Sequence, residues 1–477
     1  MVKTKYFLPA VLLAALLLRL PGCFNDFWLD EVWTWYITAQ LDSPLEILTE
    51  FKHSNNHPLN TLIYYLLGDQ QQWFWYRLPS LAAGVASVLL GWLILRNENK
   101  CAAFCAALLM STSYPMIHFS SEARGYALVI CFGLSSFFAL KSFVRQRRRR
   151  WAIAFWISVM LGFLSHPMYL HVFVASAAWL MVHLFQTLKN NREIISAYLQ
   201  CFFVPIIFCV FFYLFFIRPM TIGGGPPYRL IDVLTLTLSL AGGGPADGPA
   251  MAFIGLLTAC LFLAAVIRMR RNGRPDWLFY LIVIFLSPAA LLTFTPPKVL
   301  FVRYFLLSMA FGYLALGCFL ADFYRRAGWT KFTVATILIL SLLGHALNLV
   351  QFLRYGRGQY LQGLHFIADQ TQASVITLAS DHDFRNAMMV NFYQRYLPGD
   401  KKIAYFNQAR LPVRGTQWFI AHRLGPMAAL PGLITDHFGN PYRLVKTFPY
   451  SAMLSGFHWF IYQQQSSNYP NHSPAVP

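Results

Sequence analysis

The chain has 477 residues, of which 57% are hydrophobic and only 12% charged, and its formal net charge is +19. A soluble protein of this length would carry roughly a quarter charged residues, so the composition excludes an ordinary soluble enzyme. Apolar stretches of about 20 residues are typical of bilayer-spanning helices, and this chain has many of them. The sequence therefore predicts a polytopic α-helical membrane protein.

We predict eleven spans over residues 1–350. The first has the charged start of a signal peptide, but no small-residue cleavage site precedes the acidic pair that follows, so we expect it to remain as a helix. The expected centres are near residues 14, 87, 109, 133, 158, 178, 207, 259, 286, 312 and 341.

Lysine and arginine are distributed unevenly between the two sets of alternate connections. One set holds more than twice as many as the other. Cytoplasmic loops carry this excess, so we expect the N-terminus in the cytoplasm and the C-terminal region outside. The net charge is then a signal of topology, and no nucleic-acid partner is expected.

The first outer connection, residues 21–77, begins with FWLDEVWTWY, in which Asp30 and Glu31 stand among tryptophans. A carboxylate at a water–lipid boundary suits a general base that takes a proton from an acceptor hydroxyl. The alternative is an aromatic belt with a solvated acidic pair. The rest of the connection has apolar residues at three- and four-residue spacing, which predicts amphipathic helices along the outer surface.

Two histidines precede proline at expected outer helix starts, His57 in NNHPLN and His166 in LSHPMY. Each could hydrogen-bond a sugar or an acceptor. A divalent metal site is a further option, with Asp30, Glu31 and His57 as the candidate ligands. The alternative is that both histidines are merely satisfied polar residues. Arg77 is either a helix-end cation or a partner for a phosphate or carboxylate.

Two further outer loops carry cations suited to a lipid phosphate. The loop HFSSEARGYAL contains Glu122 and Arg124, and the planar fork of an arginine matches a phosphate, although snorkelling would also explain one arginine. The stretch TPPKVLFVRYFLL contains Lys298 and Arg303, followed by Tyr304, a further substrate-binding candidate. The alternative for these cations is a structural role at a helix end.

The second long outer connection, residues 218–250, has glycine and proline clusters around a short apolar element. This pattern fits either a mobile lid or a flexible connection without a role.

After residue 352 charged residues become frequent again. Three short stretches are predicted to be buried strands: ASVITLAS, KIAYF and QWFIAH. DFRNAMMVNFYQRYL reads as a helix between the first two. We therefore expect a small extracytoplasmic α/β domain over residues 351–477.

The ionisable residues before residue 350 gather at the expected outer ends of helices. A transporter or lipid flippase would place such groups near the bilayer midplane. The distribution therefore favours a reaction pocket at the outer interface. A third alternative makes the C-terminal domain a binding or scaffold module.

The order WLDE, HPLNTLIYYLL, RLPSLAAGV, SSEARGYAL, SHPMY and VRYFLL resembles the GT-C class of membrane glycosyltransferases. The most similar branch comprises the bacterial protein-mannosyltransferase and aminoarabinose-transferase (ArnT)-like proteins. The resemblance covers residues 1–350. Two departures are Gly125, where many relatives have proline, and HPLN in place of HPPL.

The resemblance implies an inverting transferase that uses a polyprenyl-phosphate-linked sugar at the outer face of a bacterial inner membrane. Asp30 would be the base and Glu31 its companion, while Arg124 and Arg303, assisted by Lys298, would hold the donor phosphate. The acceptor would be a glycan, a lipid or a protein, and some relatives use a divalent cation. An O-antigen-type ligase or polymerase is a related alternative.

Overall fold

The computed structural model describes residues 7–326, 328–427 and 430–465. The chain divides into two compact units. The first comprises Met1–Phe24 and Thr34–Val350, and the second comprises Asn25–Trp33 and Gln351–Pro477. The second unit therefore includes the short segment that carries the acidic pair, far from the rest of that unit in sequence.

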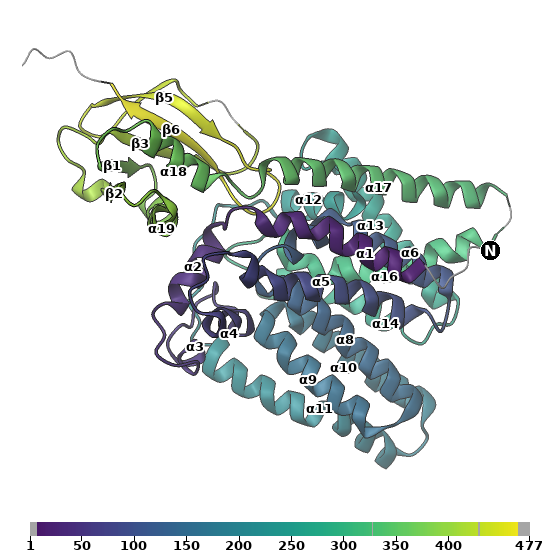
Figure 1. Cartoon of the computed structure of the whole chain (residues 1–477). Helices are drawn as coiled ribbons and strands as arrows, with labels where there is room; N and C mark the ends of the chain where they lie inside the picture. The colour runs from purple at the N-terminus through teal and green to yellow at the C-terminus, as the bar shows by residue number, and fades with distance from the viewer. Residues whose placement is uncertain (1–6, 327, 428–429, 466–477) are drawn as a thin grey trace, which may run out of the picture. The chain divides into compact units, whose positions relative to one another are not determined.

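Nine helices within the described residues are long and apolar enough to cross a membrane, or ten if the bent pair α6 and α7 counts as one span (Figure 1). The prediction of a polytopic helical membrane protein is confirmed, and the other two of the eleven expected spans correspond to helices that are bent or shorter. The stretch centred near residue 109 is the bent pair. The stretch centred near residue 158 is α9, which has 17 residues and begins with two arginines.

The helices of the first 355 residues alternate between long spans and short connecting elements. They are α1 (Phe7–Arg19), η1 (Leu20–Phe24), α2 (Leu29–Thr38), α3 (Glu46–Thr49), α4 (Pro58–Leu67), α5 (Phe74–Leu95), α6 (Lys100–Thr112), α7 (Tyr114–Ser120), α8 (Gly125–Gln146), α9 (Arg149–Ser165), η2 (Pro167–Tyr169), α10 (Leu170–Thr187), α11 (Asn191–Phe212), η3 (Tyr213–Ile217), α12 (Leu230–Gly242), α13 (Gly248–Arg271), α14 (Trp277–Leu281), η4 (Ile282–Leu286), α15 (Ser287–Phe294), η5 (Val302–Phe305), α16 (Leu306–Tyr324) and α17 (Trp329–Tyr355).

Helix α16 forms the centre of the first unit, and it is the most deeply buried of the spans. It packs against α6 and α13, and two glycines allow the close approach. A Cβ atom on Gly317 would lie 2.8 Å from the carbonyl oxygen of Ala102, and one on Gly312 would lie 2.6 Å from the ring of Phe262. Small residues at such contacts let apolar helices pack through van der Waals contact.

The break between α6 and α7 is a 60° bend. Pro115 lies in the first turn of α7, where its missing N–H is tolerated. Arg19 at the end of α1 is buried there and donates to Met110 O and Ser111 O, both at 2.9 Å. These carbonyls end α6 and lack helical partners, so Arg19 stabilises the bend.

The connection of residues 218–250 contains helix α12 and is joined to residues 52–54 by backbone hydrogen bonds. The Thr221 N–H donates to Lys52 O at 2.8 Å, and the Ser54 N–H donates to Thr221 O at 2.9 Å. The Tyr228 hydroxyl donates to Pro297 O at 2.5 Å. These bonds attach the glycine-rich stretch to two other loops of the same unit.

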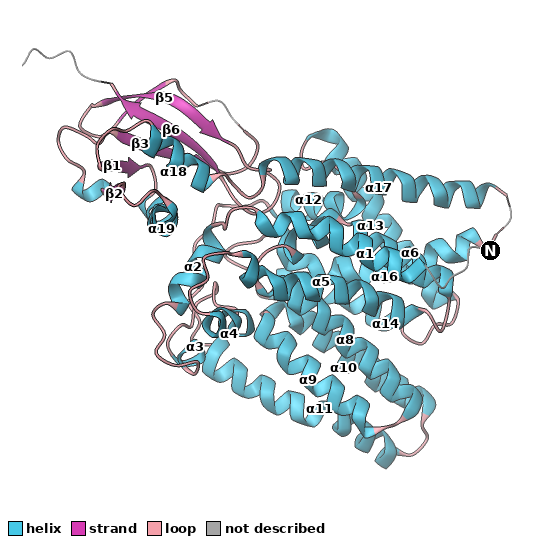
Figure 2. Ribbon diagram, viewed as in Figure 1, coloured by secondary structure: helices cyan, strands magenta, loops and turns pink. Residues whose placement is uncertain are grey.

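The second unit contains a six-stranded sheet in the order β2-β1-β3-β6-β5-β4, drawn in magenta in Figure 2. Strands β2, β1 and β3 are parallel, whereas β3, β6, β5 and β4 pair antiparallel. The elements are α18 (Tyr360–Asp369), β1 (Val375–Ser380), α19 (Asp383–Tyr393), η6 (Gln394–Tyr396), β2 (Lys402–Tyr405), η7 (Gln408–Arg410), β3 (Trp418–Arg423), β4 (Leu433–Thr435), β5 (Pro441–Phe448) and β6 (His458–Gln464).

The predicted α/β domain is confirmed, with β1, α19, β2 and β3 at the predicted stretches. Its core is aromatic, and the buried indole N–H groups have hydrogen-bond partners. The Trp418 indole donates to Thr371 Oγ1, and the Trp459 indole donates to Asn386 Oδ1. The segment Asn25–Trp33 packs within this unit. There, the Tyr393 hydroxyl donates to the carbonyl oxygen of Phe27 at 2.8 Å.

Candidate functional site

Four basic side chains of the first unit meet where helices end, and we call them the arginine–histidine cluster: His57, Arg124, His166 and Arg303. His57 and Arg124 are the N-cap residues of α4 and α8, His166 separates α9 from η2, and Arg303 lies in η5. The two imidazole centroids are 4.7 Å apart. All four positions were candidates in the sequence, and the fold brings them together.

Aromatic rings wall this cluster. The guanidinium of Arg303 lies 4.1 Å from the Phe301 centroid and 5.8 Å from that of Tyr126. Tyr126 also contacts both histidines, with centroids 5.2 and 5.3 Å away, and Tyr304 lies 6.0 Å from His166. Tyr304 was a candidate in the sequence, whereas Tyr126 was not, although it follows Arg124 in the stretch SSEARGYAL just as Tyr304 follows Arg303 in VRYFLL.

Arg124 is almost fully buried and firmly oriented. It donates through Nη1 to Thr34 Oγ1 at 2.7 Å and to Asn55 O at 2.9 Å, and its Nη2 lies 3.3 Å from His57 Nε2. Hydrogen bonds to a charged group are worth about 1.5–3 kcal/mol each. The guanidinium is therefore held in one orientation by its own unit.

Backbone N–H groups fix the tautomers of both histidines. Gly125 N–H donates to His57 Nδ1 and Met168 N–H donates to His166 Nδ1, each at 3.0 Å. A neutral imidazole has one donor and one acceptor nitrogen, so each ring carries its proton on Nε2. A proline at position 125 has no N–H and could not donate to His57. Gly125 therefore allows a hydrogen bond that a proline at this position would remove.

Both imidazoles are neutral. Burial first, and then the charge of Arg124, lower the pKa of His57 well below its ordinary value of 6.5. The same causes lower the pKa of His166 to about 3. Nε2–H of His57 and Nη2–H of Arg124 thus stand side by side as donors. Two adjacent donors next to a second arginine suit an anionic oxygen acceptor.

Three other candidates lie elsewhere in the first unit. Arg77 is buried and donates to Cys23 O at 3.1 Å, so it supports the end of η1. Glu122 is buried 3.7 Å from His118 Nε2. Lys298 is exposed in the loop between α15 and η5. Sequence spacing alone could not separate these positions from the cluster.

The acidic pair lies in the second unit, in the first turn of α2. Glu31 is fully buried, and its carboxylate accepts the N–H of Trp28 at 3.2 Å. Trp28 directly precedes the helix, so this bond is half of a capping box. Glu31 therefore has a structural role in starting α2, while the neighbouring Asp30 side chain is only partly buried.

Asp30 shares a face of α2 with Trp33, three residues on. The Trp33 ring meets Phe384 in the first turn of α19 at 5.1 Å, and Arg385 is the next residue. Burial lowers the pKa of Arg385, and the carboxylates of Asp381 and Asp30 oppose that shift. The negative charge of Asp30 therefore interacts with the guanidinium of Arg385.

Arg385 belongs to a chain of side chains at the carboxyl ends of β1 and β3. Its Nη1 lies 2.8 Å from His422 Nε2, and His422 Nδ1 lies 2.8 Å from Asp381 Oδ1. With Arg385 as donor to Nε2, the Nδ1 proton points to the carboxylate. Sequence reasoning missed these residues.

Among the described residues, no group of three or more His, Cys, Asp or Glu side chains is arranged to hold a metal ion. The acceptor nitrogen of His57 is already used by the Gly125 N–H. A metal ligand must offer that lone pair, so His57 fits the role of N–H donor better than that of a ligand beside Asp30 and Glu31.

No protein-family model matches the chain, and no curated protein matches it in sequence. Solved structures do match. Apo ArnT from Cupriavidus metallidurans aligns with a TM-score of 0.52 and 13% identity, covering 87% of this chain and 92% of that chain. The same protein bound to undecaprenyl phosphate aligns with a TM-score of 0.49 and 13% identity, covering 97% and 98%.

The Archaeoglobus fulgidus oligosaccharyltransferase in complex with Zn and sulfate aligns with a TM-score of 0.50 and 11% identity, covering 87% of this chain and 67% of that chain. In its apo form the covered share of that chain is 63%. This protein thus spans about two thirds of the oligosaccharyltransferase's length. At these identities the likeness describes the fold.

Proposed function

We propose that this chain, whose fold is the ArnT-like fold of the GT-C glycosyltransferases, moves a sugar from a polyprenyl-phosphate carrier to an acceptor at the outer face of a bacterial inner membrane. The acceptor is a lipid, a glycan or a protein. The observation that supports the proposal is the arginine–histidine cluster, a set of N–H donors with two positive charges at the helix ends, of which all but Arg303 are buried.

The cluster suits the phosphate of the donor. When the bond from sugar to phosphate breaks, negative charge grows on the phosphate oxygen, and preorganised donors that stabilise it lower the barrier. Arg124 and Arg303 supply charge, and the Nε2–H groups of His57 and His166 add hydrogen bonds without further positive charge. Tyr126 and Tyr304 offer ring surfaces beside the same point, on which a sugar face can pack.

Asp30 is our candidate for the base that activates the acceptor oxygen. A single displacement of the phosphate by that oxygen inverts the anomeric carbon. The charge of Asp30 acts on Arg385, so attraction between the two side chains helps to orient the carboxylate. Glu31 assists by starting the helix on which Asp30 sits. Arg385 therefore acts as a positioning residue.

The experiment that tests the proposal is sugar transfer by Asp30→Asn protein in proteoliposomes with a polyprenyl-phosphate sugar donor. General-base catalysis contributes about 10²–10⁴-fold, so we expect a loss of that size with normal membrane insertion. Asp42→Asn removes an exposed carboxylate of the same connection and is the matched control. Full transfer by the Asp30 variant would remove this residue from the mechanism, and lipid translocation without transfer would favour a flippase.

A further inference from the structure

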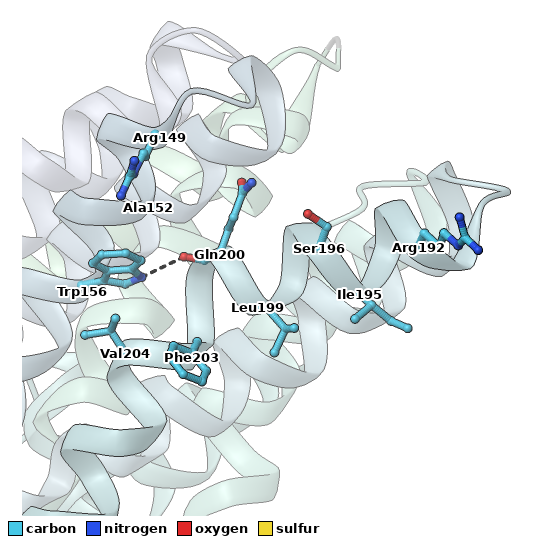
Figure 3. Close-up of a pocket in the computed structure, with 10 residues that line it drawn as sticks. All are labelled: Arg149, Ala152, Trp156, Arg192, Ile195, Ser196, Leu199, Gln200, Phe203 and Val204. Atoms are coloured by element: carbon cyan, nitrogen blue, oxygen red, sulfur yellow. Dashed lines mark hydrogen bonds between the residues drawn. The ribbon is translucent and has the colours of Figure 1, made fainter.

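A groove of about 690 Å³ runs between α9 and α11 in the first unit, at the ends where both helices begin (Figure 3). It lies at the opposite end of α9 from His166. The 17 residues of α9 correspond to about 25 Å of helix, so this groove is separate from the arginine–histidine cluster. The sequence predicts that this end faces the cytoplasm.

The mouth of the groove is positively charged. Arg149 and Arg192 line it from the first turns of α9 and α11, and both are exposed. Arg150 and Glu193 share those turns, so the two turns together carry a net positive charge. The positive ends of two helix dipoles add to it. The mouth therefore complements an anion.

A row of polar groups leads from this mouth into the groove. Arg192, Ser196 and Gln200 follow one another at four-residue spacing on one face of α11, and Figure 3 shows the Ser196 and Gln200 side chains on the same side of that helix. Gln200 lies about 12 Å along the helix from Arg192. An exposed side-chain amide such as that of Gln200 costs free energy when it faces hydrocarbon. A ligand that forms a hydrogen bond with this amide would remove the cost.

Apolar side chains form the deeper wall. Trp156 from α9 and Phe203 from α11 line the groove below Gln200. The Trp156 indole donates to the carbonyl oxygen of Gln200 at 2.9 Å, which joins the two helices at this level. Along the groove the lining thus changes from cationic to polar and then to apolar, which is the order of groups in a phospholipid.

We propose that this groove binds an anionic glycerophospholipid of the membrane leaflet on that side. Arg149 and Arg192 hold its phosphate, Ser196 and Gln200 hydrogen-bond the ester region, and an acyl chain lies along Trp156 and Phe203. Basic pockets between transmembrane helices bind anionic head groups in this way. The volume lies within the range of about 300–1,000 Å³ found for ligand pockets.

The test compares phosphatidylglycerol with phosphatidylcholine as lipids added to detergent-solubilised protein. Binding is followed by native mass spectrometry and by the shift in melting temperature. We expect wild-type protein to retain phosphatidylglycerol preferentially and the double variant Arg149→Gln/Arg192→Gln to bind it about thirtyfold more weakly, because each cation contributes roughly fivefold. The matched control is Arg325→Gln/Arg326→Gln, which removes two exposed arginines outside the groove.

Gln200→Leu keeps both arginines and should weaken retention of phosphatidylglycerol, so the test does not depend on the double variant being well folded. Equal retention of the two lipids by the wild type would overturn the proposal. So would full retention of phosphatidylglycerol by the double variant, or cross-linking that showed a second copy of the chain in the groove.

Discussion

Replacing Arg303 with alanine tests the assignment of the donor phosphate most directly. The guanidinium is partly buried and lies against the Phe301 and Tyr126 rings. Two unit charges 4 Å apart interact by about 4 kcal/mol near a protein surface and by about 1 kcal/mol in bulk water. Because Arg303 is only partly buried, we expect a loss of about 1–3 kcal/mol, which corresponds to roughly 5- to 150-fold weaker donor binding.

The assay is equilibrium binding of a polyprenyl phosphate to purified Arg303→Ala protein, measured in parallel with acceptor binding. Arg303→Lys keeps the charge and should recover part of the affinity. Arg218→Ala removes an exposed arginine of the same unit and should bind the lipid normally. Unchanged donor affinity in the alanine variant, or an equal loss in the Arg218 control, would refute the reasoning.

Three further predictions concern packing, pH and the second unit. Gly125→Ala places a Cβ atom against a backbone carbonyl oxygen, so the melting temperature should fall, with about 1–3 kcal/mol lost. The pKa of His166 is about 3 in the folded protein, against an ordinary value of 6.5. As the pH drops, the unfolded chain therefore binds a proton before the folded protein does. The free energy of unfolding should fall between about pH 6.5 and pH 3. Melting curves of His166→Asn should show a smaller fall. In Arg385→Gln, loss of the cation that attracts the Asp30 carboxylate should lower kcat for sugar transfer more than it changes the KM for the donor, whereas Arg385→Lys should restore kcat. An unchanged kcat in Arg385→Gln would mean that Arg385 does not act on Asp30.

The fold was largely predictable because long apolar runs and short β-rich runs are local signals. β1, α19, β2 and β3 were expected at their observed stretches. Strands β4, β5 and β6 were not, although the four apolar residues WFIY in β6 could have indicated a strand. The expected spans centred near residues 109 and 158 correspond to the bent pair α6 and α7 and to the 17-residue helix α9, and hydropathy does not register such a bend.

The site was predictable only in part. His57, Arg124, His166 and Arg303 stood out because charged and imidazole groups are rare at the ends of apolar spans. The tautomer that His57 and His166 share depends on backbone N–H groups, which no sequence pattern reveals. The grouping of Asn25–Trp33 with the second unit depends on contacts such as that of Tyr393 with Phe27, 366 residues apart.

The backbone bonds of Thr221 to Lys52 and Ser54 join two connections that are distant in sequence. Neither loop can change its conformation without stretching or breaking this short ladder. A carrier lipid that ordered one of them would restrain the other as well, so both stretches should gain protection from proteases in a single step and at one ligand concentration.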